Sequence, residues 1–251
     1  MAARNMWVRQ EYKPNKCKFE QPFELEITLV NSSGTKEGDE MKLTRKSRIK
    51  KLKLVQNYSA LGSTVWDGSI VLAKMFDNRR LFSETYLRSC RVVELGAGCG
   101  LVGLYICLLG AKHTTLTDQT CCISLLEENV RFNIPKSDQA RIRVKEYSWG
   151  DRVDNLTESG LFQLILAAEV LYSAEDSLLL AKSIPYLADE EARVFVSMGR
   201  NRGGEQSFVD VMKRQGWTIR EVCYEVVLIA ISAGICPIVK KRVKFPYWGV
   251  Y

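Results

Sequence analysis

From residue 63 onward, short apolar runs alternate along the chain with segments whose apolar positions recur every three or four residues. The first pattern is typical of buried strands and the second of amphipathic helices. We expect strands at Arg91–Leu95, His113–Thr117, Arg141–Glu146, Gln163–Ala168, Arg193–Ser197, Thr218–Glu225 and Val226–Val239. We expect helices at Asp67–Phe76, Gly100–Leu109, Gln119–Asn133, Ala174–Leu187 and Glu205–Gln215. This alternation predicts an α/β fold in which a mainly parallel, seven-stranded sheet carries helices on both faces.

The first 53 residues follow a different pattern. Phe23–Val30 alternates like a half-buried strand, and the polar, glycine-containing stretch Asn31–Glu40 predicts a loop. Between Lys42 and Lys53, seven of the twelve residues are basic and none is acidic. That segment fits either the solvated face of a strand or a patch that binds a partner. We therefore divide the chain into an N-terminal extension with β-strands, residues 1–53, and a large α/β domain, residues 54–251.

The composition changes this picture little. With 46% hydrophobic and 26% charged residues in 251, the chain is ordinary for a globular protein. Lys and Arg number 36 against 29 for Asp and Glu, an excess that suits an acidic protein partner or a nucleic acid and requires neither.

The cysteines indicate a reducing compartment. The eight cysteines include no Cys-x-x-Cys pair and His113 is the only histidine, so we expect no metal site. The first residues lack the apolar core of a signal peptide, and we expect reduced thiols in a protein of the cytoplasm, with the nucleus as a second location. The longest uncharged run, Val226–Val239, has 14 residues and is too short to span a bilayer, so we expect no membrane partner.

The clearest chemical signal is the stretch RVVELGAGCGLVG. A predicted strand ends at Leu95, glycines follow at positions 96, 98 and 100, and an apolar helix comes next. Glycines allow a sharp turn and let a ligand approach where a Cβ would collide, so the stretch predicts a nucleotide-binding loop. In register with the strand, the pattern is Glu-x-Gly-x-Gly-x-Gly from Glu94, whereas the dinucleotide pattern Gly-x-Gly-x-x-Gly fails at Leu101.

The in-register pattern resembles that of S-adenosylmethionine-dependent methyltransferases of the Rossmann-like class, and the resemblance runs from about Ser63 to the C-terminus. The next predicted strand is followed by Asp118, about 20 residues beyond the glycines, where an acid can bind the ribose hydroxyls of an adenosine. The alternative role for Asp118 is an N-cap of the following helix. For Glu94 we expect contact with the amino group of the cofactor, and the alternative is a buried carboxylate that ties loop amides together.

Three further motifs narrow the resemblance. In STVWDGSIVLAKMF, Trp66 stands just before a predicted helix upstream of the first sheet strand. Trp149 follows the third strand in KEYSWGD, and AAEVLYS ends the fourth. Their joint order resembles family 16, the protein-lysine methyltransferases that include those acting on valosin-containing protein and on chaperones. The resemblance implies that the cofactor is held by Trp66, Glu94, Gly96, Ala97, Gly98, Asp118, Trp149 and Ala168.

The resemblance also places Glu169 and Tyr172 at the Asp-x-x-Tyr positions of the family, as candidate catalytic residues. Glu169 departs from the aspartate of the family by one methylene, a reach of about 1.5 Å. A carboxylate beside a lysine amine favours its ammonium form, so we expect Glu169 to position the ammonium, or a backbone amide near it, and not to act as a simple base. Tyr172 would pack against the aliphatic part of the lysine. The structural alternative is that Glu169 caps the following helix while the tyrosine packs beneath it.

The expected activity is methyl transfer to a lysine of a protein, with S-adenosylmethionine as cofactor and a monomeric enzyme. Two other readings stay open. A nucleic-acid methyltransferase would use the basic segment, although the fourth strand lacks the Asn/Asp-Pro-Pro-Tyr ending typical of many such enzymes. A non-catalytic cofactor-binding subunit would keep the loop and lose turnover. Further candidate substrate contacts are Glu175, Asp176, Arg200 and Arg202.

Overall fold

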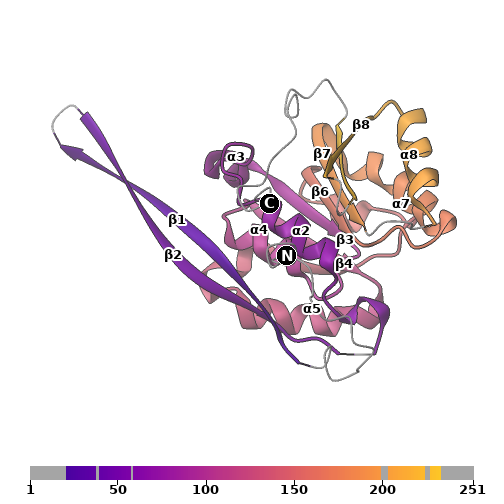
Figure 1. The fold of residues 1–251 in the computed structure, drawn as a ribbon, viewed down its shortest axis with the longest axis horizontal. Coiled ribbons are helices and arrows are strands. Elements are labelled where there is room, and N and C mark those ends of the chain that lie inside the picture. The colour runs from indigo at the N-terminus through magenta and orange to yellow at the C-terminus, as the bar shows by residue number, and fades with distance from the viewer. Residues whose placement is uncertain (1–20, 38–39, 58, 199–202, 224–226, 233–251) are drawn as a thin grey trace, which may run out of the picture.

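The computed structural model describes residues 21–37, 40–57, 59–198, 203–223 and 227–232, and Figure 1 shows its ribbon. Seven strands form one sheet in the order β5-β4-β3-β6-β7-β9-β8. Their bounds are β3 Arg91–Leu95, β4 His113–Asp118, β5 Ile142–Glu146, β6 Phe162–Ala168, β7 Ala188–Met198, β8 Thr218–Cys223 and β9 Val227–Ser232. Strands β5, β4, β3, β6 and β7 are parallel to one another, and β9 runs antiparallel to both of its neighbours. The predicted α/β fold is confirmed.

Helices cover both faces of this sheet. Alternate side chains of β3 enter opposite layers: Val92 packs in a cluster with the first set of helices and Val93 in a cluster with the second. The first set is α2 (Asp67–Met75), α4 (Leu101–Leu108) and α5 (Thr120–Asn133). The second is α6 (Asp154–Thr157), α7 (Ala174–Leu187) and α8 (Glu205–Arg214). In the described part of the chain, no helix has the length and apolar character needed to cross a membrane.

Several elements differ from the prediction. β7 begins at Ala188 and not at Arg193, because its polar first residues ADEEA gave no apolar signal. The short helix α3 (Glu84–Ser89), capped by the Ser83 side chain, was not predicted, nor were α6 and the 3-10 turns η2 (Leu61–Ser63) and η3 (Lys136–Arg141). Of the predicted strand Val226–Val239, β9 is confirmed and the rest lies outside the described residues.

The N-terminal extension contains one long hairpin. β1 (Phe23–Glu37) pairs antiparallel with β2 (Glu40–Leu54), and Figure 1 shows the hairpin projecting away from the sheet. The predicted loop at Asn31–Glu40 is therefore wrong, because β1 continues to Glu37 and β2 begins at Glu40. The letters NSSGTKE carry no apolar alternation, and that alternation arises only where a strand covers a core.

The base of the hairpin belongs to the core. Ile27, Leu52 and Leu54 are fully buried in the cluster that contains α4 and α5. Two asparagines of α5 form hydrogen bonds with the backbone at the end of β2 and just after it. The Asn133 amide exchanges hydrogen bonds of 2.9 and 2.8 Å with the backbone of Lys53, and the Asn129 amide exchanges bonds of 2.8 and 3.0 Å with the backbone of Val55. These amides satisfy backbone groups that a free strand edge would leave open.

The described part of the basic segment is partly neutralised. Lys51 and Lys53 lie 3.5 and 3.8 Å from the Glu24 carboxylate across the hairpin. The Lys50 ammonium donates a 2.7 Å hydrogen bond to the Asn133 carbonyl oxygen. At these three positions the segment behaves as the solvated face and edge of a strand.

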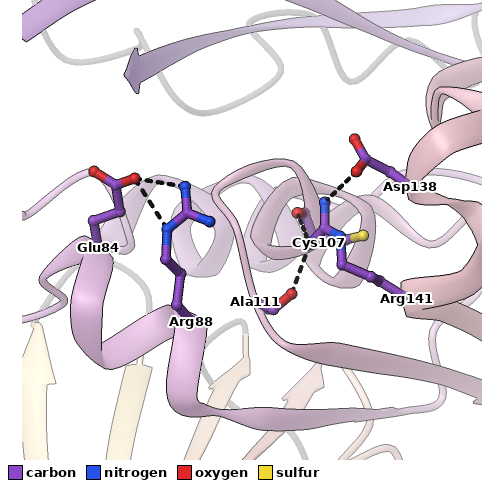
Figure 2. Close-up of polar contacts among 6 residues, drawn as sticks. All are labelled: Glu84, Arg88, Cys107, Ala111, Asp138 and Arg141. Carbon is purple, nitrogen blue, oxygen red and sulfur yellow. Dashed lines mark hydrogen bonds and ion pairs between the residues drawn. The ribbon is translucent and has the colours of Figure 1, made fainter. Parts of the chain in front are cut away.

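Helix α4 is held at its carboxyl end by Arg141. The guanidinium Nη1 donates hydrogen bonds of 2.7 Å to the Ala111 carbonyl and 3.3 Å to the Cys107 carbonyl, and Nη2 lies 3.0 Å from Asp138. Figure 2 shows this fork beside the exposed Glu84–Arg88 pair of α3. A cation at this end complements the helix dipole. It adds a charged donor to the Cys107 carbonyl, which also accepts from Gly110 N–H, and binds the Ala111 carbonyl just beyond the helix.

Candidate active site

The glycine loop lies where the carboxyl ends of β3, β4 and β6 meet. Gly98 N–H donates a 2.7 Å hydrogen bond to Asp118 Oδ2, which joins the loop to the end of β4. A Cβ added at Gly96, whose φ is +69°, would lie 3.0 Å from the Trp149 ring and 2.9 Å from Val170. The structure therefore brings Gly96, Gly98, Asp118 and Trp149 together.

Gly98 has a second reason to be glycine. Its φ is +56°, and a Cβ there would lie 2.5 Å from the Gly62 carbonyl oxygen. The segment before α2 thus crosses the loop in van der Waals contact, and the Cys99 thiol points to the same carbonyl at 3.7 Å. The glycines were expected to leave room for a ligand, but at Gly98 the space is taken by the protein's own backbone at Gly62.

Glu94 holds the start of α4. It is 2% exposed, and its Oε2 accepts a 2.7 Å hydrogen bond from the Gly103 N–H in the first turn of that helix. Burial, with a smaller contribution from the charge of Asp118, raises the pKa of Glu94 to about 8. Glu94 thus ties β3 to the first turn of α4, and contact of Glu94 with a cofactor amino group stays a prediction.

Asp118 is placed to hold a polar ligand at the mouth of the loop. Its Oδ2 accepts from Gly98 N–H and its Oδ1 from Gln119 N–H at 2.8 Å. Each carboxylate oxygen has two acceptor positions, so these two bonds leave capacity for hydroxyl donors such as those of a ribose. Gln119, and not Asp118, occupies the N-cap position of α5.

The remaining predicted cofactor residues lie on neighbouring elements. Trp66 is the half-buried N-cap residue of α2. Trp149 follows β5 and is half-buried. Ala97, 8% exposed, donates its N–H to the Thr117 carbonyl, and Ala168, 7% exposed, is the last residue of β6.

Glu169 is bound to α2. Its Oε1 accepts a 3.0 Å hydrogen bond from the Gly68 N–H in the first turn of α2. Its own N–H donates to the Ser197 carbonyl at 2.7 Å, and the Ser197 hydroxyl donates to the Gly68 carbonyl at 2.8 Å. These contacts form a closed ring, which we call the Gly68–Glu169–Ser197 ring.

The backbone of Glu169 is strained. Its φ is +59°, and it is the one non-glycine residue with positive φ in the described ranges. The left-handed region costs about 1–2 kcal/mol for such a residue, and strain of this kind gathers at functional sites where the surroundings fix it. Here the ring fixes it, with the Glu169 side chain only 5% exposed.

Tyr172 lies between this ring and α7. It is 42% exposed, as a residue that meets a substrate can be.

The N-terminus of α7 is capped by Ser173, whose hydroxyl oxygen accepts a 3.1 Å hydrogen bond from the Asp176 N–H. The alternative reading of Glu169 as the cap of α7 is therefore wrong. Asp176 is part of this cap and Glu175 is exposed, while Arg200 and Arg202 lie outside the described residues.

Sequence reasoning missed two residues of the site. Gly68 was visible as a glycine in the first turn of a predicted helix, an unfavourable choice unless space is short, and a Cβ there would lie 2.5 Å from the Glu169 Oε1. Ser197, fully buried, had no signal, because a serine at the end of a strand is unremarkable without knowing its partners.

The side chains gathered at the site fit a nucleoside cofactor. The half-buried tryptophans Trp66 and Trp149 can cover an apolar ring, and Asp118 can accept from hydroxyls. Across the residues that the structure describes, no three His, Cys, Asp or Glu side chains gather as metal ligands would.

Comparisons with known proteins agree with this geometry. A family model described as lysine methyltransferase matches residues 46–215. The chain is 32% identical over 177 residues to protein N-lysine methyltransferase METTL21A of Danio rerio, covering 70% of this chain and 78% of that protein. It is 28% identical over 166 residues to EEF1A lysine methyltransferase 3 of Xenopus tropicalis, covering 64% and 70%.

Solved structures show the same fold. The 16S rRNA N2 G1207 methyltransferase of T. thermophilus, in complex with AdoMet and guanosine, has a TM-score of 0.55 at 14% identity and covers 81% of this chain and 50% of that one. The magnesium protoporphyrin IX methyltransferase of Synechocystis has a TM-score of 0.53 at 12% identity and covers 66% and 86%. The chain belongs to the lysine methyltransferase family and is an S-adenosylmethionine-dependent protein-lysine methyltransferase.

Proposed function

We propose that the Gly68–Glu169–Ser197 ring and Tyr172 form the end of the site where the substrate lysine is methylated. The cofactor supplies an electrophilic methyl group on sulfur. Around it, Asp118 would hold the ribose, Glu94 the amino group, and Trp66 and Trp149 the apolar surfaces. The loop residues Gly96, Ala97 and Gly98 and the strand end at Ala168 would contact it through backbone and Cβ atoms.

The chemistry of amines sets the role of Glu169. A lysine amine has a solution pKa of about 10.4 and must lose a proton before it can attack. A carboxylate beside the amine favours the charged form, so Glu169 serves to position and not to deprotonate. The proton passes to water, and the rate comes mainly from holding the amine in line with the methyl group, which can contribute several kcal/mol.

A single observation carries this proposal: the acid at the end of β6 is bonded to the first turn of α2, directly after Trp66. Through that bond, Glu169 joins the tryptophan that would cover the cofactor to the strand end that would face the substrate. The extra methylene of a glutamate supplies the reach to Gly68 N–H that an aspartate at this backbone position would lack, by about 1.5 Å.

The test is Glu169→Gln. Its amide oxygen can still accept from Gly68 N–H, so the ring is kept and the charge is lost. We expect cofactor affinity, measured by calorimetry with S-adenosylhomocysteine, to stay within about twofold, and single-turnover methylation to slow by at least about tenfold, the loss of about 1.4 kcal/mol of transition-state stabilisation. Glu128→Gln is the control on the exposed surface of α5. Full turnover in Glu169→Gln would remove Glu169 from the methyl-transfer step.

The substrate class has its own test. Radiolabelled cofactor and a cell extract should label a band that survives nuclease and disappears with protease, and mass spectrometry should place the label on lysine. Label lost with nuclease would favour a nucleic acid as substrate. No label with any extract, together with intact cofactor binding, would favour a non-catalytic subunit.

We also propose that the enzyme is a monomer of the cytoplasm and nucleus. All the elements of the proposed site come from one chain, which supports the first part. Within the described ranges, Cys90, Cys99, Cys107, Cys121 and Cys122 are free thiols, which agrees with a reducing compartment. Light scattering after gel filtration tests the first part, and imaging of the tagged protein in cells tests the second.

A further inference from the structure

A separate pocket lies toward the amino-terminal ends of β3, β4 and β5, away from the glycine loop. Its volume is about 50 Å³. A water needs about 10–15 Å³ of such space, so the pocket has room for a few waters or one small ion. It is lined by Arg91, His113, Thr114, Thr115, Arg143, Lys145, Asn155, Leu156, Glu158 and Ser159.

The sheet register places the basic side chains on one face. In the parallel ladders, Arg91 lies opposite His113, Thr115 opposite Arg143, and Thr117 opposite Lys145. Side chains two residues apart on a strand share a face, so all four basic residues face the layer that holds α6. The turn of α6 and the residues after it, from Asn155 to Ser159, complete the wall.

The charges of this pocket are unbalanced. Three permanent cations and the imidazole face a single acid, Glu158. No ion pair joins Arg91, Arg143 or Lys145 to an acid in the part of the chain that the structure describes. Arg91 Nε is buried and lacks a hydrogen-bond partner among the described residues, while its guanidinium lies 5.6 Å from the centre of the Phe162 ring.

The cations also act on one another. The pKa of Arg91 is lowered by burial and then by Arg143. The pKa of His113 is lowered by burial and then by Arg91, Arg143, Lys112 and Arg141. Cations brought together without a counter-charge cost free energy, and a bound anion would offset that cost.

We propose that this pocket binds a phosphoryl group, as inorganic phosphate or as part of a small phosphorylated molecule. A tetrahedral oxyanion offers acceptors on several sides, which matches the guanidinium forks of Arg91 and Arg143, the ammonium of Lys145 and the hydroxyls of Thr115 and Ser159. The cations converge on a space that holds one such group. An extended nucleic acid strand would instead need a row of cations along a groove.

The single histidine makes the test direct. His113 is the only imidazole in the chain, so its proton resonances report on this pocket without assignment of other histidines. Adding millimolar inorganic phosphate should shift these resonances. It should also raise the pKa of His113, because an anion stabilises the imidazolium against Arg91, Arg143, Lys112, Arg141 and the nearby Lys145. Phosphate is already mainly the monoanion in the pH range where His113 titrates, because the pKa of His113 is lowered. Within that range, phosphate should bind more tightly as His113 takes up its proton.

Variants separate the pocket from general surface charge. We expect Arg143→Gln with Lys145→Gln to weaken phosphate binding by at least about tenfold, and Glu158→Gln to strengthen it. Lys213→Gln, which removes one exposed positive charge from α8, should leave binding unchanged. The proposal would be overturned if the His113 resonances did not shift when phosphate is added at constant ionic strength. It would also be overturned if Lys213→Gln weakened phosphate binding as much as the change of Arg143 and Lys145.

Binding of inorganic phosphate, of a nucleoside diphosphate and of a short oligonucleotide should show which kind of molecule carries the phosphoryl group. Tighter binding of phosphate than of a nucleoside diphosphate would indicate the free ion, and the reverse would indicate a nucleotide; both support the pocket. A short oligonucleotide that shifts His113 while phosphate and the nucleoside diphosphate do not would replace the proposal by a nucleic acid surface. None of these measurements uses methylation, so the result is independent of the proposed function.

Discussion

Three acidic side chains of the site form hydrogen bonds with backbone N–H groups. Glu94 binds the first turn of α4, Glu169 binds the first turn of α2, and Asp118 binds the glycine loop. Each carboxyl group supplies an oxygen acceptor for an N–H group at a loop or helix start. The sequence singles out the same three acids as functional residues, so the bonds that fix their side chains also fix the groups proposed to act in the site.

Gly68→Ala tests the Glu169 contact from the other side. Alanine in place of glycine inside a helix normally stabilises it by about 1 kcal/mol. Here the added Cβ would lie 2.5 Å from Glu169 Oε1, and we expect a loss of about 1–3 kcal/mol in the free energy of unfolding with a matching loss of turnover. Denaturant unfolding and methylation assays measure both.

Gly203→Ala is the control for that change, since its Cβ would lie 3.5 Å from the Tyr172 carbonyl oxygen, an ordinary contact. It should resemble the wild type in stability. A Gly68→Ala protein as stable and active as the wild type would show that the Glu169 side chain moves without consequence.

Glu94 should make stability depend on pH. Its folded-state pKa is about 8 against a reference value of 4.5, so the folded protein holds the proton more tightly than the unfolded chain. The folded state therefore loses stability as pH rises from about 4.5 to 8, relative to a variant with a neutral side chain there. The free energies of unfolding of the wild type and of Glu94→Gln should be most similar near pH 4.5. Above that pH, the free energy of unfolding of the wild type should fall below that of the variant. Parallel curves would contradict the assignment.

At the scale of elements, α4 depends on residues far from it in sequence. Glu94 binds its amino end and Arg141 binds the Cys107 carbonyl in its last turn. The helix itself, LVGLYICL, is apolar and has no charged residue. Helix ends leave backbone groups without partners inside the helix, and here those partners come from β3 and from the residue before β5.

Arg141→Gln should cost about 1–3 kcal/mol of the free energy of unfolding, because it removes charge-assisted hydrogen bonds at a helix end. Arg88→Gln breaks the pair shown beside it in Figure 2, where the arginine side chain is 64% exposed, and should cost less than about 1 kcal/mol. Urea unfolding of both variants measures the difference. Equal costs would show that Arg141 does not cap α4.

The elements that cover a core were predictable, and those that do not were missed. β3 and β6 were placed within a residue because apolar runs mark buried parallel strands. The outer half of the hairpin and the polar start of β7 lack that signal. In the site, the glycine pattern predicted which residues would meet, but the partner of Glu169 depends on how α2 packs on the sheet, which a local pattern does not encode.

At the scale of the whole molecule, the hairpin and the sheet share one core. Leu52 and Leu54 are fully buried in the same cluster as Leu104 and Leu116. The hairpin base therefore should not unfold on its own, although Figure 1 shows its outer part standing clear of the domain.

Leu52→Ala tests this shared core. It should lower the free energy of unfolding by about 2–5 kcal/mol and shift a single cooperative transition that is the same by circular dichroism and by tryptophan fluorescence. Ile49→Ala, on the same strand and 69% exposed, should have little effect. Two separate transitions would show that the hairpin folds independently.

The Gly68–Glu169–Ser197 ring has a practical consequence for anyone who needs an inactive form of this enzyme in cells. Replacing Glu169 by alanine would remove a bond that supports α2, so lower protein abundance could be mistaken for lost methylation. If Tyr172 meets the substrate as we propose, it is a better position to change, because none of the three hydrogen bonds that close the ring involves it. An inactive allele built on Tyr172, and matched to the wild type by immunoblot, would separate the phenotype of missing methyl groups from that of missing protein.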